Sequence, residues 1–290
     1  MPARFQKPYD VFTTQESETE MTSPATSRPS PLDWSAGAYE ATAAELEPVA
    51  ERVVALAAPE PGERVLDIAC GTGNAALLAA RRGATAIGVD SAPRLIEVAR
   101  SRAVADSPLG HASFMIGDAQ DLPFEDAAFD LVLSVFGVIF AQDPQRALSE
   151  IVRVLRPGGR ALVTAWLPDG AMSNVVGIAV GAVVAATGMA QPRFAWHDPG
   201  TLSDLVASCG ASVSFKDGAV AFTDSSPESY FGAVQVAHPL HVSTRPLLEQ
   251  AGTYDDVRER MLAALRDGNE DPDAFRITSR YRVARIQRTT

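Results

Sequence analysis

The residues of this sequence best suited to bind a nucleotide are two aspartates and two glycines, which lie at the ends of neighbouring apolar runs. Asp67 lies inside an apolar run, and the turn that follows it carries Gly71 and Gly73. Asp90 ends the next apolar run. Glycines let a ligand approach the backbone, a helix that begins after the turn offers free N–H groups, and a carboxylate at a strand end can accept hydrogen bonds from ribose hydroxyls. This pattern indicates a site for a nucleotide-like cofactor.

The glycine turn by itself fits two kinds of cofactor. Gly71-x-Gly73-x-x-Ala76 also satisfies the dinucleotide pattern of NAD-dependent oxidoreductases. Such an enzyme needs a nicotinamide-side pair such as Tyr-x-x-x-Lys, and no lysine of the chain has a tyrosine at that spacing before it. Asp67, inside the strand, favours a different family, although an aspartate that only ends a strand is the alternative interpretation.

The glycine turn is the first of several motifs that stand in order along the chain. Residues 67–74 read DIACGTGN, 117–124 read GDAQDLPF, 129–134 read FDLVLS and 154–160 read VLRPGGR. In this order they resemble the class I S-adenosylmethionine (SAM) dependent methyltransferases, most of all the ubiquinone/menaquinone-methyltransferase-like group, whose members modify small molecules. The resemblance covers residues 40–166 in detail and the remainder in outline.

The resemblance implies a fold, a cofactor and a reaction. The fold is α/β, a Rossmann-like, doubly wound, seven-stranded and mostly parallel sheet with an inserted helical lid. The cofactor is S-adenosyl-L-methionine, and the reaction moves its methyl group to an O, N or C atom of a small molecule by in-line displacement, as in secondary metabolism. A non-catalytic SAM-binding module is the alternative, because an intact site indicates binding rather than turnover.

Matching the family's motifs to this chain implies cofactor contacts at the ends of four strands. Asp90 would hold the ribose, unless it only caps the next helix, and Asp118 with the following backbone N–H would meet the adenine, unless it belongs to a polar surface turn. Cys70 has no base beside it and is predicted to be a small packing residue rather than a nucleophile. The implied cofactor-binding residues are Asp67, Ala69, Cys70, Gly71, Gly73, Asn74, Asp90, Ser91, Asp118, Ala119, Ser134 and Phe136.

Aromatic and histidine side chains are the candidates for the acceptor site. Trp34 and Tyr39 either fold over the cofactor or staple the N-terminal segment to the core. Phe136 and Phe140 either shape the pocket or belong to the core. His238 is a candidate general base for an acceptor hydroxyl, with a packing or surface role as the alternative. The predicted substrate-pocket residues are Trp34, Tyr39, Phe140 and His241, and no metal site is expected, because nothing completes a metal spacing around the two histidines.

Alternating strands and helices must position the cofactor residues. Hydrophobic periodicity first predicts a helix over 38–57, bent or split at Pro48. Strands are then predicted at 65–69, 84–90, 112–117, 129–136 and 160–166, with helices over 75–82, 94–105 and 144–155 between them.

The remainder of the chain is predicted to form the lid and the end of the sheet. Helices are expected within 167–196 and over 201–208, 227–240 and 254–265, with a short strand over 211–216. The last strand, 275–286, is expected to be antiparallel at the sheet edge. The predicted division is a disordered tail over 1–31, with Met21 as an alternative start, and one domain over 32–290 that contains a cofactor half (32–166), a lid and acceptor half (167–274) and the last edge strand (275–287).

Composition limits the possible partners. The chain has 290 residues, 46% of them hydrophobic, with a net charge of −11 and two cysteines. Acidic charge disfavours a nucleic-acid substrate, and the low cysteine count fits the cytoplasm. No membrane span is expected, because the most apolar segment, 175–186, is short. Arginines in the last strand are interpreted as a charged, soluble edge rather than a nucleic-acid surface. A small-molecule acceptor and a monomer or homodimer are expected.

Overall fold

A seven-stranded mixed sheet forms the centre of the fold. The computed structural model describes residues 32–105, 111–188 and 194–289, so the predicted disordered tail lies outside the described residues. The strands stand in the order β3-β2-β1-β4-β5-β7-β6. Neighbours from β3 to β5 pair in parallel, whereas β7 is antiparallel to both β5 and β6. The strands are β1 (Arg64–Ile68), β2 (Thr85–Asp90), β3 (His111–Ile116), β4 (Phe129–Ser134), β5 (Leu155–Trp166), β6 (Ala211–Asp224) and β7 (Phe275–Arg288).

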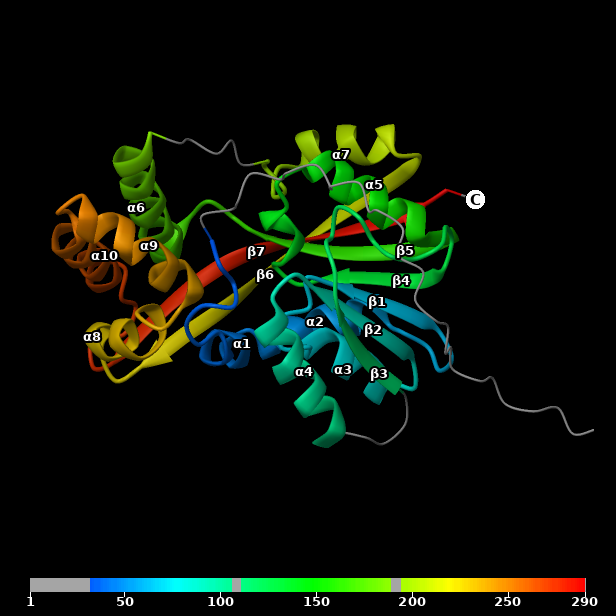
Figure 1. Ribbon diagram of the computed structural model, residues 1–290, viewed down its shortest axis with the longest axis horizontal. Helices are drawn as coiled ribbons and strands as arrows, with labels where there is room; N and C mark the ends of the chain where they lie inside the picture. The colour runs from blue at the N-terminus through cyan, green and yellow to red at the C-terminus, as the bar shows by residue number, and fades with distance from the viewer. Residues whose placement is uncertain (1–31, 106–110, 189–193, 290) are drawn as a thin grey trace, which may run out of the picture. The chain divides into compact units, whose positions relative to one another are not determined.

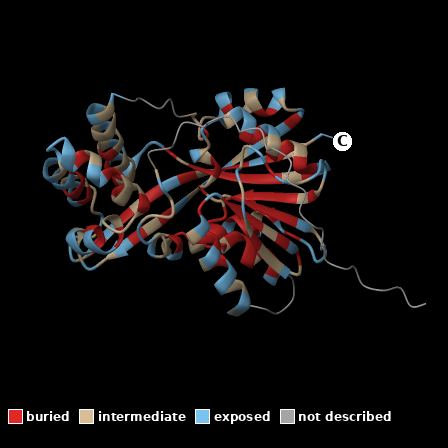
Figure 2. Ribbon diagram, viewed as in Figure 1, coloured by how far each residue is buried: buried red, intermediate tan, exposed pale blue. Residues whose placement is uncertain are grey.

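Helices cover both faces of the sheet, and the predicted doubly wound α/β fold is confirmed. One face carries α2 (Glu47–Ala57), α3 (Asn74–Arg81) and α4 (Pro93–Ala105), and the other carries α5 (Pro144–Val154) and α7 (Pro199–Ser208) (Figure 1). The inner parallel strands β1, β2, β4 and β5 are mostly buried between the two layers, whereas β3 at the edge is more exposed (Figure 2). Their sequences are therefore apolar on both sides, as parallel strands require.

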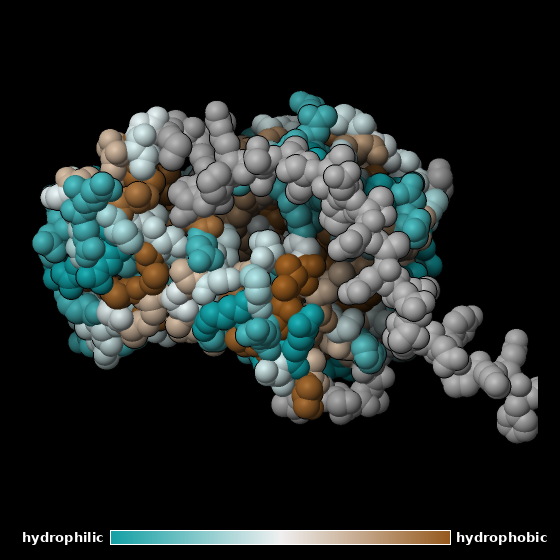
Figure 3. Space-filling model, viewed as in Figure 1, coloured by the Kyte–Doolittle hydropathy of each residue, from teal (hydrophilic) through white to brown (hydrophobic). Residues whose placement is uncertain are grey.

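The lid is a group of helices at the far ends of β6 and β7 (Figure 1). These two strands pair over their whole length, from Ala211 opposite Arg288 to Asp224 opposite Phe275. The face seen in Figure 3 is mostly hydrophilic over the lid, with smaller apolar patches among the hydrophilic residues. The lid consists of α6 (Gly170–Thr187), α8 (Pro227–Tyr230), a π-helical turn η2 (Phe231–Gln235), α9 (Pro239–Gln250) and α10 (Tyr254–Asp267). Helix α1 (Glu40–Glu45) precedes α2 and the first strand in the sequence.

The expectation that the last strand forms the sheet edge is wrong. β7 lies between β5 and β6, and β6 is much longer than the predicted strand over 211–216. Both edges of β7 are paired with neighbouring strands. Its alternating pattern therefore reflects one buried face and one more exposed face, and not a position at the sheet edge. Its arginines form ion pairs within the protein: Arg276 with Glu270, Arg280 with Asp169, and Arg282 with Asp217.

The helix predicted over 227–240 is interrupted. His238 has an extended ψ of 137° and begins α9 as its N-cap. The residue before a proline is disfavoured in the helical region, and Pro239 follows His238 directly. The N-terminal helix is split near Pro48 as predicted, because α1 ends at Glu45 and α2 begins at Glu47.

Helix α6 is long and apolar enough to cross a membrane by length and composition alone. The prediction from sequence judged the apolar part of this segment too short. In the structure α6 is a lid helix that packs against α9, α10 and β7, and only 17% of its apolar window is buried. By itself, one such helix is weak evidence for a membrane span.

Two glycine substitutions test how tightly the sheet is packed. A Cβ at Gly88, in β2, would lie 2.5 Å from the Phe114 ring and 2.8 Å from Cys70 Sγ. We expect Gly88→Ala to lower the free energy of unfolding by about 1–3 kcal/mol through overpacking. Gly181→Ala, in α6, is the matched control, because nothing lies within 4 Å of its Cβ position. It should raise stability by up to about 1 kcal/mol. Urea unfolding measures both, and equal effects would contradict the packing argument.

Candidate cofactor cleft and acceptor cavity

The predicted glycine turn and Asp90 meet at the carboxyl ends of β1 and β2. The amide of Gly71 donates to Asp90 Oδ2 at 2.8 Å, and the amide of Ala92 donates to Oδ1 at 2.9 Å. Asp90 is 7% exposed, and burial raises the pKa of its carboxyl. Each carboxylate oxygen can accept more than one hydrogen bond, so this position remains suited to a diol.

Asp67 and Cys70 are buried beneath the turn. Asp67 Oδ2 accepts from the amide of Ala76 at 3.0 Å, which ties β1 to the first turn of α3. Burial, reinforced by the charge of Asp90, raises the pKa of Asp67 to about 7. Burial also raises the pKa of the Cys70 thiol. The thiol therefore stays protonated, which agrees with a packing role.

Two predicted cofactor residues use their side chains inside the protein. Asn74 donates to the carbonyl of Ala43 at 2.7 Å and accepts from Arg102 at 2.6 Å. Ser134 Oγ donates to the carbonyl of Ile68 at 2.8 Å and accepts from the amide of Val138. These side chains hold loops in place. Sequence reasoning missed Arg102, which also donates to the carbonyl of Thr72.

The end of β3 lies beside Asp90. Asp118 is exposed and accepts from the amide of Gln120 at 2.9 Å. Ile116 stands opposite Asp90 in the strand register and is 51% exposed. Ile116 was not predicted, although an exposed isoleucine beside a nucleotide-type carboxylate offers an apolar surface to a planar base. Ser91 and Ala119 follow Asp90 and Asp118 at these strand ends, and Ala69 and Gly73 adopt positive φ in the turn.

A cavity of about 660 Å³ lies between the carboxyl ends of β4 and β5 and the lid. Phe136 and Trp166 line it with stacked rings whose centroids are 3.7 Å apart. Phe136 adopts φ of 59°, which is costly for an aromatic residue and turns the chain sharply after β4. All three tryptophans of the chain line the cavity.

Four of the sequence-predicted residues come together at the cavity mouth. Trp34 lies 4.7 Å from Phe140, 6.0 Å from Tyr39 and 5.9 Å from His238, measured between ring centroids. The N-terminal segment is also tied to the lid, because the amide of Ala38 donates to the carbonyl of Ala237. Trp34 and Tyr39 therefore both staple this segment and line the cavity.

Tyr39 connects the cavity to the cofactor cleft. It lines the cavity, and a Cβ built on Gly71 would lie 3.3 Å from its ring. Burial, together with the charge of Asp90, raises the pKa of Tyr39 to about 12. The glycine turn and the cavity are thus separated by one aromatic side chain.

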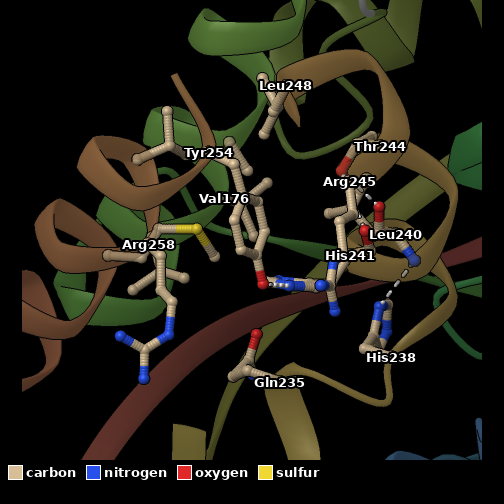
Figure 4. Close-up of a pocket in the computed structure, with 14 residues that line it drawn as sticks. Val176, Gln235, His238, Leu240, His241, Thr244, Arg245, Leu248, Tyr254 and Arg258 are labelled. Carbon is tan, nitrogen blue, oxygen red and sulfur yellow. Dashed lines mark hydrogen bonds between the residues drawn. The ribbon is translucent and has the colours of Figure 1, made fainter. Parts of the chain in front are cut away.

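The geometry of His238 does not suit a general base. Its Nδ1 accepts from the amide of Leu240 at 3.1 Å (Figure 4). In the neutral ring the proton therefore resides on Nε2, which can only donate. Burial lowers the pKa of His238 to about 4, so the ring stays neutral. Within the cavity wall, this histidine serves as a helix cap and a hydrogen-bond donor.

His241 lines a second, smaller cavity. Its Nε2 is 3.0 Å from the hydroxyl of Tyr254, inside a small cavity of about 20 Å³ between α6, α9 and α10 (Figure 4). His238 lines both this cavity and the large one, whereas His241 does not line the large cavity among the described residues. Of the two histidines, only His238 therefore contacts the candidate acceptor cavity.

Glu45 is the cavity residue that sequence reasoning missed. It accepts from the hydroxyl of Tyr230 at 3.4 Å, and burial raises its pKa to about 7. Within 32–105, 111–188 and 194–289, the cavity is lined by no lysine or arginine. The same described ranges hold no cluster of three or more His, Cys, Asp or Glu that could bind a metal.

Comparison with known proteins identifies the part of the chain that carries the motifs. Residues 66–163 match the model of a methyltransferase domain. This segment is similar to a methyltransferase domain. The match supports the predicted family, and SAM as the cofactor, for this part of the chain. It contains the glycine turn, Asp90 and Asp118, but neither the lid nor the N-terminal segment.

Relatives match less than half of the chain rather than the whole of it. An uncharacterized protein of Mycobacterium tuberculosis is 43% identical over 138 residues, which are 47% of this chain and 50% of that protein. The demethylmenaquinone methyltransferase of Clavibacter sepedonicus is 41% identical over 106 residues, 37% of this chain and 42% of that enzyme. The chain thus spans about half the length of the curated relatives it matches.

A solved structure extends the likeness of fold beyond the methyltransferase domain. The YcgJ protein of Bacillus subtilis superposes with a TM-score of 0.58 at 18% identity, covering 83% of this chain and 98% of that one. At this identity the comparison supports the fold alone.

The buried carboxyl of Asp67 gives a pH-dependent contribution to stability. Its raised pKa means that the folded state holds a proton that the unfolded state has released between about pH 4 and pH 7. The stabilising contribution is complete at low pH and is lost as pH rises through 7. We expect Asp67→Asn to become more stable relative to wild type as pH rises from about 5 to about 8. Urea unfolding at both pH values measures this, and parallel changes in the two proteins would contradict it.

Proposed function

We propose that this protein is a SAM-dependent methyltransferase that moves a methyl group to an O, N or C atom of a small molecule. The observation that carries the proposal is the position of Tyr39. Its ring lies next to the glycine turn and also lines the cavity of about 660 Å³. A methyl donor held at the turn would therefore lie beside a site for the acceptor.

The residues at the carboxyl ends of β1 to β3 fit SAM. Asp90 would accept from the ribose hydroxyls, and the glycine turn would let the methionine part lie against the backbone. Ile116 and Asp118 would contact the adenine. Bound SAM would supply an electrophilic methyl group on a sulfonium: the acceptor atom would bond to the methyl carbon in line with the C–S bond, which breaks to release S-adenosylhomocysteine.

The protein's own contribution would be to orient the acceptor and exclude water. Close approach and alignment supply most of the rate in such displacements, and a dry site strengthens the effect. Trp34, Tyr39 and Phe140 close the cavity from the N-terminal side, while α6 and η2 close it from the lid. This arrangement needs no catalytic triad.

The acceptor proposed here is small and largely apolar. The cavity is within the size range of small-molecule sites, and its wall is mostly aromatic and aliphatic. The net charge of −11 disfavours nucleic acid. One relative is named as a demethylmenaquinone methyltransferase, so its name indicates a quinone precursor as the acceptor. An acceptor of that kind agrees with the apolar cavity wall. We further propose a cytoplasmic protein that acts as a monomer or homodimer and needs no membrane.

Calorimetric titration tests the cofactor. We expect SAM to bind and NADH to give no signal. Asp90→Ala should weaken SAM binding by about 1–3 kcal/mol, because hydrogen bonds to a charged group are lost. Asp118→Ala, at an exposed position, should cost less, and Asp126→Ala, an exposed aspartate outside the cleft, should change nothing. Tight NADH binding without SAM binding would overturn the proposal.

Turnover separates an enzyme from a non-catalytic SAM-binding module. We expect S-adenosylhomocysteine to form when the protein is incubated with SAM and a library of small apolar alcohols, phenols and amines. Gly71→Val should abolish both SAM binding and product, since its side chain would fill the approach to the backbone. His238→Ala should retain turnover, because the ring cannot accept a proton at Nε2. Binding of SAM with no methyl gain in any compound would favour the module.

A further inference from the structure

Glu45 lies in the cavity wall, where packing alone does not require a carboxylate. It ends α1 and lines the cavity together with Thr42 and Leu46. Its single hydrogen-bond donor among the described residues is the Tyr230 hydroxyl, at the long distance of 3.4 Å. Glu45 is half-buried, and a carboxylate partly removed from water is destabilised unless it is paired with a cation or several donors. Glu45 therefore has unused acceptor capacity that faces the cavity.

The charged groups around Glu45 do not neutralise it. Tyr230 approaches from α8, and Asp224, at the end of β6, adds negative charge. Asp169 is the other carboxylate of the cavity wall, and it is paired with Arg280 at 2.8 Å. Among the residues that the structure describes, the wall thus contains one acid without a cationic partner and no lysine or arginine.

Further polar atoms of the wall also lack partners. Thr42 Oγ1, Ser279 Oγ and Trp196 Nε1 are buried and make no hydrogen bond with any described residue. Ser279 is 4% exposed and Trp196 is 3% exposed. Unsatisfied buried polar groups in a cavity of this size are typical of a ligand site. Thr42 and Glu45 are three residues apart on a helix and so lie on one face.

We propose that the acceptor is an uncharged aromatic compound with a free hydroxyl group, and that this hydroxyl donates a hydrogen bond to Glu45. Rings of the wall supply the surface for its aromatic part, and Tyr230 positions the carboxylate. That this ligand is the methyl acceptor rests on the proposed function, whereas its recognition by Glu45 does not. Anionic compounds are excluded by the same carboxylate. The aromatic residues of the wall are Trp34, Tyr39, Phe136, Phe140, Trp166, Phe194, Trp196, Phe222 and Tyr230.

Three naphthalene probes of equal ring size test the recognition by calorimetry. 1-Naphthol is neutral, 1-naphthoate is an anion and 1-naphthylmethylamine is a cation at about pH 8. We expect wild type to bind 1-naphthol about tenfold or more tightly than 1-naphthoate, as hydrogen bonds to charged groups suggest. Below about pH 7 the carboxyl of Glu45 is neutral, so the preference over the anion should shrink. Tightest binding of the cation would overturn the proposal.

Matched variants connect the effect to Glu45. Glu45→Gln should weaken 1-naphthol binding about fivefold or more and make the naphthol-to-naphthoate ratio independent of pH. Glu51→Gln is the control, because this residue is exposed on the adjoining helix α2. In Tyr230→Phe the midpoint of the pH dependence should move upward, since the hydrogen bond from Tyr230 favours the charged carboxylate. Thermal unfolding confirms that each variant is folded.

The outcomes separate this inference from the proposed function. If SAM binds but 1-naphthol does not, or if Glu45→Gln leaves naphthol binding unchanged, the inference fails and the methyltransferase proposal stands. If 1-naphthol binding depends on Glu45 but SAM does not bind, the recognition stands and the methyltransferase proposal fails. Equal affinity for all three probes would also overturn the inference.

Discussion

The hydrogen bond from the amide of Gly71 to the carboxylate of Asp90 is the contact on which the site depends. It joins the turn after β1 to the end of β2, with 2.8 Å between the amide nitrogen of Gly71 and Oδ2 of Asp90. Because Asp90 is almost fully buried, its charge acts on Tyr39 and Asp67 as well. One contact therefore sets the shape of the cofactor cleft and the electrostatics of the wall that divides it from the cavity.

The long β6–β7 pair determines where the acceptor can bind. The two strands continue past the parallel part of the sheet and carry the lid helices with them (Figure 1). The lid is held over the ends of β4 and β5, where α/β sheets bind ligands. The arginines of β7 serve this arrangement through internal ion pairs, such as that between Arg282 and Asp217 at 2.7 Å. A basic strip in the sequence is thus a set of structural contacts.

The polar groups of the site divide into two kinds. Asn74, Ser134 and His238 are satisfied by neighbouring backbone groups and hold loops or begin a helix. Glu45 and Ser279 line the cavity with acceptor or donor capacity left over. The second kind gains more from a ligand, because a buried polar group without a partner recovers the hydrogen bond it lacks. This difference makes Glu45 a stronger candidate than the histidine that the sequence suggested.

The sequence by itself determined the parallel strands, the glycine turn and the acid at the end of the next strand, because these follow from local patterns of apolar residues, glycines and a strand-ending carboxylate. Trp34, Tyr39 and Phe140 were also recognisable, as aromatic residues near those ends. Only the tertiary structure decided that β7 is interior, that His238 but not His241 lines the large cavity, and that Glu45 faces the acceptor site. These facts depend on contacts between distant segments, such as Glu45 with Tyr230, which leave no periodic trace in the sequence.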